Sequence, residues 1–151
     1  MEIRAFEIRD AQDVFSIIKE CFNKIDLGMH TSSGIQIQLE GNSPEKLIEK
    51  SHKVRYFVAI QNTKVIGICG HDHERIHTLF IKPDYHHEGI GGKLLDFVLQ
   101  HAKIEGLSEI RTWSTYFAVD FYKRFGFQVL NDIYLPEGKR DIGLVEMVRT
   151  I

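Results

Sequence analysis

The chain has 151 residues, with 19 basic against 21 acidic side chains and a formal net charge of -2 at neutral pH. This length fits a single domain, residues 1–151, that buries roughly two-thirds of its unfolded surface. The balanced charge offers no basic patch for nucleic acid or anionic lipid, and no apolar run reaches the ~20 residues of a membrane span. With no signal peptide at Met1, and with Cys21 and Cys69 expected to be free buried thiols, we expect a cytoplasmic protein, monomeric or homodimeric.

The N-terminal half of the chain predicts strands and helices in succession. Its predicted elements are, in chain order, an edge strand (Glu2–Ile8), a helix with Asp10 as N-cap (Asp10–Asn23), a stretch without sustained periodicity (Ile25–Asn42), a helix with Pro at its first position (Ser43–His52) and two strands around a turn at Asn62-Thr63 (Arg55–Gln61 and Lys64–His71). The first helix rests on apolar residues at helical spacing, and the hairpin on two apolar runs that flank a two-residue turn. This half therefore contributes antiparallel strands.

The C-terminal half predicts one βαβ unit and a closing strand pair. Its predicted elements are a turn (Asp72–Glu74), a strand (Arg75–Ile81), a helix from Gly89 that ends at Gly106, a strand (Glu109–Thr115), a short helix (Ala118–Phe125) and two antiparallel strands (Phe127–Tyr134 and Gly143–Val148) around the loop Pro136–Asp141. A helix between two strands of one sheet makes those strands parallel. We therefore expect a mixed α/β (α+β) fold, with a mostly antiparallel central sheet, a central βαβ unit and flanking helices.

The connection into the central helix is rich in glycine, and we call residues 86–93 the glycine turn. It reads His86-His87-Glu88-Gly89-Ile90-Gly91-Gly92-Lys93. A helix N-terminus leaves its first N–H groups unpaired and partly positive, and glycine lets the backbone approach an anion closely. The turn therefore predicts a phosphate site, with an ordinary tight strand-to-helix turn as the alternative.

Spacing excludes two widespread phosphate motifs. A P-loop requires Gly at position 87 and Ser or Thr at position 94, where this chain has His87 and Leu94. The dinucleotide fingerprint requires a third glycine three residues after Gly91, and that residue is also Leu94. What remains is x-x-Gly-x-Gly, preceded by a strand and a proline.

Two blocks resemble motifs of the GNAT acyltransferases. The pattern His86-x-x-Gly89-x-Gly91 resembles that family's motif A, Gln/Arg-x-x-Gly-x-Gly/Ala, with His in place of Gln or Arg. Residues 118–127, AVDFYKRFGF, resemble its Ala-x-x-Phe-Tyr-x-x-x-Gly-Phe motif. One helix and one strand separate the blocks, as in the family. The resemblance extends from about Val65 to Phe127 and implies a GNAT fold and acetyl transfer from acetyl-CoA to an amine.

The resemblance also implies where acetyl-CoA binds, without a metal. Its pyrophosphate would lie on the backbone amides of the glycine turn, and its pantetheine arm between the parallel strands, which the family splays apart. The residues implied in cofactor binding are Leu79, Phe80, Ile81, His86, His87, Glu88, Gly89, Ile90, Gly91, Gly92, Lys93 and Thr115. Thr115 departs from the family pattern, because many members have Asn at this position; its hydroxyl would contact the pantetheine instead.

Three residues are the catalytic candidates. Tyr122 matches the tyrosine that the family commonly uses as general acid towards the departing thiolate, with a core anchor as the alternative. A lysine-type amine with pKa ~10.4 costs about 4–5 kcal/mol to deprotonate at pH 7, so a base is needed. His77 is the first candidate, because strand alternation places it on the face of Leu79 and Ile81 and histidine titrates near neutral pH. Glu74 is the second, and solvated strand-end residues are the alternative for both.

Other readings stay open. Histidines and acids at positions 71–77 and 86–87 suggest a metal site, but no established ligand spacing is matched, and the turn at Asp72–Glu74 is expected to break the geometry. A non-catalytic acyl-CoA sensor or partner module on the same fold is the second function class. The acceptor, a small-molecule or protein amine, is not readable; Ile25–Asn42 and Pro136–Asp141 are expected to contribute to its site.

Overall fold

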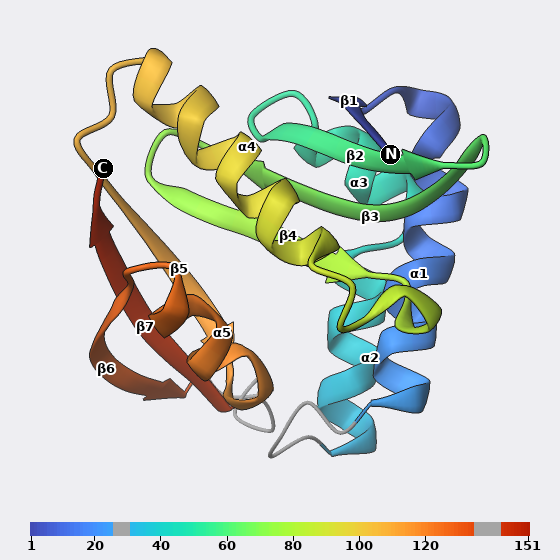
Figure 1. Cartoon of the computed structure of the whole chain (residues 1–151). Coiled ribbons are helices and arrows are strands. Elements are labelled where there is room, and N and C mark those ends of the chain that lie inside the picture. Colours follow the sequence, from blue (N-terminus) through green and yellow to red (C-terminus); the bar gives the residue numbers. More distant parts are fainter. Residues whose placement is uncertain (26–30, 135–142) are drawn as a thin grey trace.

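A computed structural model describes residues 1–25, 31–134 and 143–151, with only the backbone described for residues 132–134 and 143. The strands in this part of the chain are β1 (Glu2–Ala5), β2 (Arg55–Gln61), β3 (Lys64–His71), β4 (Arg75–Ile81), β5 (Glu109–Thr115), β6 (Gln128–Tyr134) and β7 (Gly143–Thr150). They form one seven-stranded sheet in the order β1-β2-β3-β4-β5-β7-β6 (Figure 1). Every neighbouring pair is antiparallel except β4 and β5. The expected mixed sheet with one central βαβ unit is therefore confirmed.

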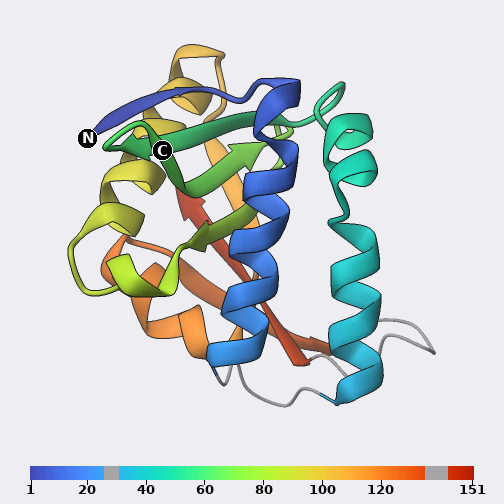
Figure 2. The ribbon, with the colours of Figure 1, turned by 90° about the vertical axis from the view of Figure 1, so that its right-hand side faces the viewer.

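Helices cover both faces of this sheet. They are α1 (Ala11–Lys24), α2 (Ser32–Gly41), α3 (Pro44–Lys50), α4 (Ile90–Ile104) and α5 (Val119–Arg124). The helices α1, α2 and α3 lie on one face, and α4 and α5 on the other (Figures 1 and 2). None of the helices in the described ranges is long and apolar enough to cross a bilayer.

Two apolar cores hold these layers together. On the α1 face, Val14, Ile18 and Phe22 of α1 pack with Leu47 of α3 against the sheet. On the α4 face, the predicted stripe Ile90, Leu94, Leu95, Val98 and Ala102 is buried. The helical spacing of apolar residues thus identified the core-facing side of α4 correctly.

The N-terminal segment differs from the expected elements in two places. The edge strand ends at Ala5 rather than Ile8, and a 3₁₀ turn, Ile8–Asp10, follows. Asp10 does stand at the N-cap position of α1, but its side chain makes no hydrogen bond to that helix. Its carboxylate instead accepts from the Glu7 backbone N–H at 2.8 Å and pairs with the Arg4 guanidinium at 2.8 Å. The partly buried ion pair and the Glu7 hydrogen bond therefore hold this side chain in place of a helix cap.

The helix α2 was not expected from the sequence. Its N-cap is Thr31, whose hydroxyl accepts from the Gly34 N–H at 3.1 Å. Ile35 and Leu39, four residues apart, pack against the core on the α1 face. Two apolar contacts among glycine, serine and glutamine give a weak periodic signal, and tertiary packing supplies the rest of its stability.

Candidate functional site

The ladder between the two parallel strands is short, and the strands separate beyond it. Only Arg75 with Arg111 and Ile76 with Thr112 are paired, although both strands are described in full and continue for several residues more. We call the gap beyond these pairs the β4–β5 split. Its predicted existence is confirmed, and it leaves backbone groups of both strands without their usual strand partner.

A β-bulge in β4 lies directly beyond the last pair. His77 opposes Gly70 and Phe80 opposes Ile68, so Thr78 and Leu79 together oppose one residue of β3. Thr78 has a φ of 57°, a strained conformation for a β-branched residue, and its hydroxyl lies 3.3 Å from the Tyr56 hydroxyl. The bulge marks this part of β4 as a specialised segment.

The bulge corrects the predicted orientation of His77. Residues that oppose one another across a ladder share a face, and Gly70 and Ile68 lie on one face of β3. His77 therefore shares the α1 face with Phe80 rather than the face of Leu79 and Ile81. The single extra residue in the bulge reverses the alternation on which the prediction rested.

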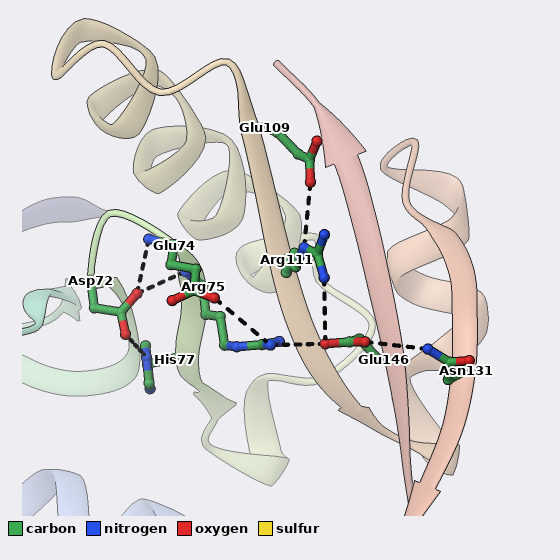
Figure 3. A network of polar contacts seen from close by, with 8 residues as sticks. All are labelled: Asp72, Glu74, Arg75, His77, Glu109, Arg111, Asn131 and Glu146. Carbon is green, nitrogen blue, oxygen red and sulfur yellow. Dashed lines mark hydrogen bonds and ion pairs between the residues drawn. The ribbon is translucent and has the colours of Figure 1, made fainter.

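His77 is held by an acidic partner. Its Nε2 lies 2.7 Å from Asp72 Oδ2, and the side chains are 31% and 29% exposed (Figure 3). Burial alone would raise the Asp72 pKa, but hydrogen bonds from the Arg75 N–H and from His77 bring it below its ordinary value. Glu74, the other base candidate, is 70% exposed and lies 4.0 Å from the Arg75 guanidinium. Only His77 of the two lies in β4, next to the split.

Tyr122 lies on the α4 face of the sheet, opposite to the face of His77, and like His77 it lies near the end of the β4–β5 ladder. Its side chain is buried in the α4-side core and hydrogen bonds Thr112, the last paired residue of β5. Burial raises the pKa of Tyr122, with the nearby Cys69 adding to the shift. The hydroxyl therefore keeps its proton at neutral pH. Tyr122 and His77 thus stand on the two sides of the point where β4 and β5 separate.

The glycine turn opens α4 with unpaired amides. Gly89 is the N-cap with a φ of 79°, and no side chain in the described residues caps this end. The first backbone bond into the helix runs from the Lys93 N–H to the Gly89 carbonyl at 3.1 Å. The N–H groups of the preceding helical residues therefore point out of the helix end. His87 has a φ of 64° and is exposed together with Glu88 and Gly89, so the turn is open to solvent.

The end of β4 is fastened to its surroundings through one carbonyl. The Ile81 carbonyl accepts from His86 Nε2 at 2.7 Å and from the Cys21 thiol at 3.2 Å. Burial raises the pKa of Cys21 to about 12, so this thiol stays a donor. Two donors satisfy both lone pairs of that oxygen. Leu79, which belongs to the bulge beside the split, remains as the expected backbone contact there.

The two glycines in the first turn of α4, Gly91 and Gly92, differ in how much space surrounds them. A Cβ at Gly91 would meet only ordinary contacts, the nearest at 3.6 Å. A Cβ at Gly92 would come within 2.6 Å of the Phe125 ring. Gly92 therefore permits α5, which carries Tyr122, to approach α4. Lys93 is exposed, Phe80 packs into the α1-side core, and Thr115 is half-buried at the end of β5.

An ion-pair network braces the closed end of the split. Arg75 donates to Glu146 of β7 at 2.8 Å and stacks on Trp113, with the guanidinium carbon 4.2 Å from the ring centroid. Arg111 approaches the same carboxylate at 4.0 Å, and Asn131 lies 3.5 Å from its other oxygen (Figure 3). The hydrogen bond from Arg75 lowers the pKa of Glu146. This network ties β4 to β7 across β5, where the ladder ends.

A histidine cluster lies at the end of β3. His71, His73 and Glu105 place ligand atoms within 4.8 Å of one another, and His71 Nε2 is 3.0 Å from His101 Nδ1. The His73 backbone N–H donates to His71 Nδ1 at 3.2 Å, so the neutral ring carries its proton on Nε2. Burial lowers the pKa of His71 to about 4 and keeps the ring neutral. Because a metal would need the Nε2 lone pair, these contacts do not fit a metal ion bound at His71.

The sequence candidates therefore form two groups. The structure brings His77, Leu79 and Tyr122 to the split, and residues 86–93 to the helix end beside it. Sequence reasoning missed Thr112, which lacks a motif, and did not assign Asp72 to the site. The turn chemistry of Asp72 was a usable signal, since an Asp that bonds backbone two and three residues on commonly closes a hairpin.

Comparison with known proteins identifies the family of this chain. Residues 52–129 match the family model described as an acetyltransferase (GNAT) domain. An uncharacterized N-acetyltransferase of Methanocaldococcus jannaschii is 32% identical over 75 residues, which are 48% of this chain and 33% of that protein. The matched part thus spans about a third of that relative's length.

Solved structures share the fold. The PaiA N-acetyltransferase of Thermoplasma acidophilum, in complex with coenzyme A, is 24% identical with a TM-score of 0.81 and covers 99% of this chain and 98% of its own. A GCN5-related N-acetyltransferase from Rhodopseudomonas palustris is 15% identical with a TM-score of 0.88, and the match covers 99% of this chain and 95% of that one. Since the family model matches more than half of the sequence, the chain belongs to the GNAT acetyltransferase family.

Proposed function

We propose that this chain transfers an acetyl group from acetyl-CoA to an amine. The observation that carries the proposal is the β4–β5 split, with an uncapped, glycine-rich helix N-terminus beside it. An open strand edge can bind an extended amide-bearing arm, and unpaired helical amides can bind phosphate. The coenzyme A in the PaiA neighbour of the same fold supports this choice of cofactor.

We assign the cofactor contacts from this geometry. The amides of residues 87–92 would hold the pyrophosphate, because the Lys93 N–H already donates to the Gly89 carbonyl. His86 would position the turn through its bond to the Ile81 carbonyl. The backbone of Leu79, in the split, would bond the pantetheine arm, while Phe80 and Ile81 shape the strand and Thr115 borders it on β5. Acetyl-CoA supplies the acetyl group as a thioester when bound.

The catalytic roles follow from the two faces of the sheet. His77, on the α1 face, would take a proton from the ammonium form of the acceptor, directly or through water, and release it to solvent. The free amine then forms the C–N bond as the C–S bond breaks. Tyr122, on the α4 face, would donate to the departing thiolate and recover a proton that the new amide nitrogen loses, so that one proton is released per turnover. Glu74 remains the second base candidate.

The acceptor is proposed only as a small-molecule or protein amine. We further propose that residues 1–151 act as one GNAT domain, because both ends of the chain contribute strands to one sheet. We propose a cytoplasmic monomer or homodimer, without nucleic acid or membrane partners, on the basis of the balanced charge. A non-catalytic acyl-CoA sensor is the alternative, and the paired His77 and the buried hydroxyl of Tyr122 favour catalysis.

Binding is tested first, by thermal unfolding of the chain with acetyl-CoA, with free acetate and with ADP. Acetyl-CoA at ~100 times its Kd should raise the free energy of unfolding by about 2.7 kcal/mol. Acetate should leave it unchanged, and ADP should stabilise less because it lacks the pantetheine. An unchanged melting temperature with saturating acetyl-CoA would contradict the proposed cofactor.

Turnover is tested next, with a panel of amines that includes polyamines, amino acids, aminoglycosides and peptide N-termini. Free CoA can be measured with a thiol reagent, because Cys21 and Cys69 are buried in the native protein and add little background. Acetyl-CoA binding without CoA release on any amine, in a protein that melts cooperatively, would favour the sensor.

A further inference from the structure

Asp72 occupies a rigid position between the β3–β4 turn and His77. Its Oδ1 accepts from the backbone N–H groups of Glu74 at 3.0 Å and Arg75 at 2.8 Å. Its Oδ2 lies 2.7 Å from His77 Nε2 (Figure 3). Rotating the carboxylate would sacrifice two backbone hydrogen bonds, so the oxygen that faces His77 is fixed by the turn.

This contact determines which ring nitrogen of His77 carries the proton. An ionised carboxylate can only accept hydrogen bonds, and its backbone donors keep Asp72 ionised at neutral pH. The proton of the neutral His77 ring therefore lies on Nε2, and Nδ1 keeps its lone pair. At 31% exposure the ring is open enough to meet an acceptor or water.

We propose that Asp72 is a positioning residue that makes His77 Nδ1 the proton acceptor of the acetyl-transfer reaction. This inference rests on the proposed function. His77 Nδ1 takes a proton from the acceptor ammonium, and the resulting imidazolium keeps its Nε2–H bond to the Asp72 carboxylate, which stabilises the positive charge. The proton on Nδ1 then passes to solvent, and the ring returns to its starting tautomer.

A purely structural role for Asp72 is the competing explanation, since the residue also closes a hairpin turn. The substitution Asp72→Asn separates the two roles. An Asn keeps Oδ1 for the Glu74 and Arg75 N–H groups, so the turn is retained. Its NH₂ group replaces Oδ2 and donates to His77 Nε2. The neutral ring then carries its proton on Nδ1, the nitrogen that should be free.

The test combines ¹⁵N NMR of the His77 ring with steady-state kinetics of CoA release. We expect the Nε2–H tautomer in the unsubstituted protein and the Nδ1–H tautomer in Asp72→Asn. The kcat/KM for the amine should fall between about 10²- and 10⁴-fold. The KM for acetyl-CoA should change less than twofold, because the glycine turn is untouched. Asp96→Asn, which removes an exposed carboxylate in the middle of α4, is the charge-matched control and should keep full activity.

Two further results decide the proposal. His77→Gln should lose as much activity as Asp72→Asn, and the double variant should lose no more, since both act through one nitrogen. Full activity in Asp72→Asn, or an Nδ1–H ring in the unsubstituted protein, would overturn the role of Asp72 even if acetylation proceeds. A protein that shows the Nε2–H ring but neither binds acetyl-CoA nor acetylates any amine would overturn the proposed function instead, and the catalytic role with it. The ring tautomer is read without any substitution, so instability of a variant does not remove the test.

Discussion

At the scale of single residues, the site depends on two polar side chains held on opposite faces of one sheet. Tyr122 reaches the split through its hydrogen bond to Thr112, and His77 reaches it through Asp72. Thr112 is the last β5 residue of the β4–β5 ladder, and Asp72 begins the turn that leads from β3 into β4. In the proposed reaction, Tyr122 would act on the leaving group and His77 on the acceptor.

We expect Tyr122→Phe to reduce kcat by between about 10²- and 10⁴-fold, because the departing thiolate loses its donor. The affinity for acetyl-CoA should be nearly unchanged, since the helix amides are intact. Steady-state CoA release and a binding titration measure the two effects. Thr112→Val separates loss of the hydroxyl from loss of its hydrogen bond and should have the smaller effect on kcat. Equal turnover by the unsubstituted protein and Tyr122→Phe would leave the hydroxyl with a packing role only.

At the scale of elements, the split is produced by neighbours that hold each strand apart from the other. The strand β4 is bound to β3 and fastened at Ile81 by α1 and the glycine turn, while β5 is paired along its length with β7. On the α4 face, the contact of Gly92 with the Phe125 ring sets the separation between α4 and α5. The position of Tyr122 therefore depends on the small size of Gly92, because a side chain there would collide with the Phe125 ring.

We expect Gly92→Ala to be less stable than Gly91→Ala by about 1–3 kcal/mol in free energy of unfolding, the typical cost of overpacking. Both substitutions gain the same helix propensity, about 1 kcal/mol relative to Gly. Only the Cβ at Gly92 meets the Phe125 ring at 2.6 Å, whereas the one at Gly91 has 3.6 Å contacts. Urea unfolding of the two variants without ligand measures the difference. Equal stabilities would mean that the Phe125 ring moves aside without cost.

At the scale of the whole molecule, one buried histidine couples stability to pH. His71 is fully buried, and burial lowers its pKa from 6.5 to about 4. Between these values the unfolded chain binds a proton that the folded protein does not. The contribution of the neutral His71 ring to the free energy of unfolding is therefore complete above pH 6.5 and is lost as pH falls towards 4. The loss is at most on the order of 3 kcal/mol.

We therefore expect the free energy of unfolding to fall between pH 6.5 and 4, and to fall less steeply in His71→Asn. The Asn oxygen keeps an acceptor for the His73 N–H but does not titrate. Urea unfolding at a series of pH values measures the slopes, with His52→Asn as the control for loss of an exposed histidine. Parallel slopes in the unsubstituted protein and His71→Asn would show that the buried ring does not control acid stability.

The sequence by itself determined the order of the elements, the core-facing stripe of α4 and the family. These features are local or short-range: a period of 3.6 residues, a glycine-rich helix start, and two motifs one helix and one strand apart. The sequence did not predict α2, because its two apolar contacts depend on packing against α1 and α3. It also predicted the wrong face of the sheet for His77.

Only the tertiary structure decided which side chains meet at the split. The bulge at Thr78 arises from the pairing of β4 with β3, so alternation within one strand could not reveal that His77 faces α1. The Thr112 contact of Tyr122 and the reason for Gly92 likewise arise between segments distant in the chain. Motifs follow from local backbone chemistry, whereas the orientation of a catalytic side chain depends on the register of neighbouring strands, which the whole sheet sets.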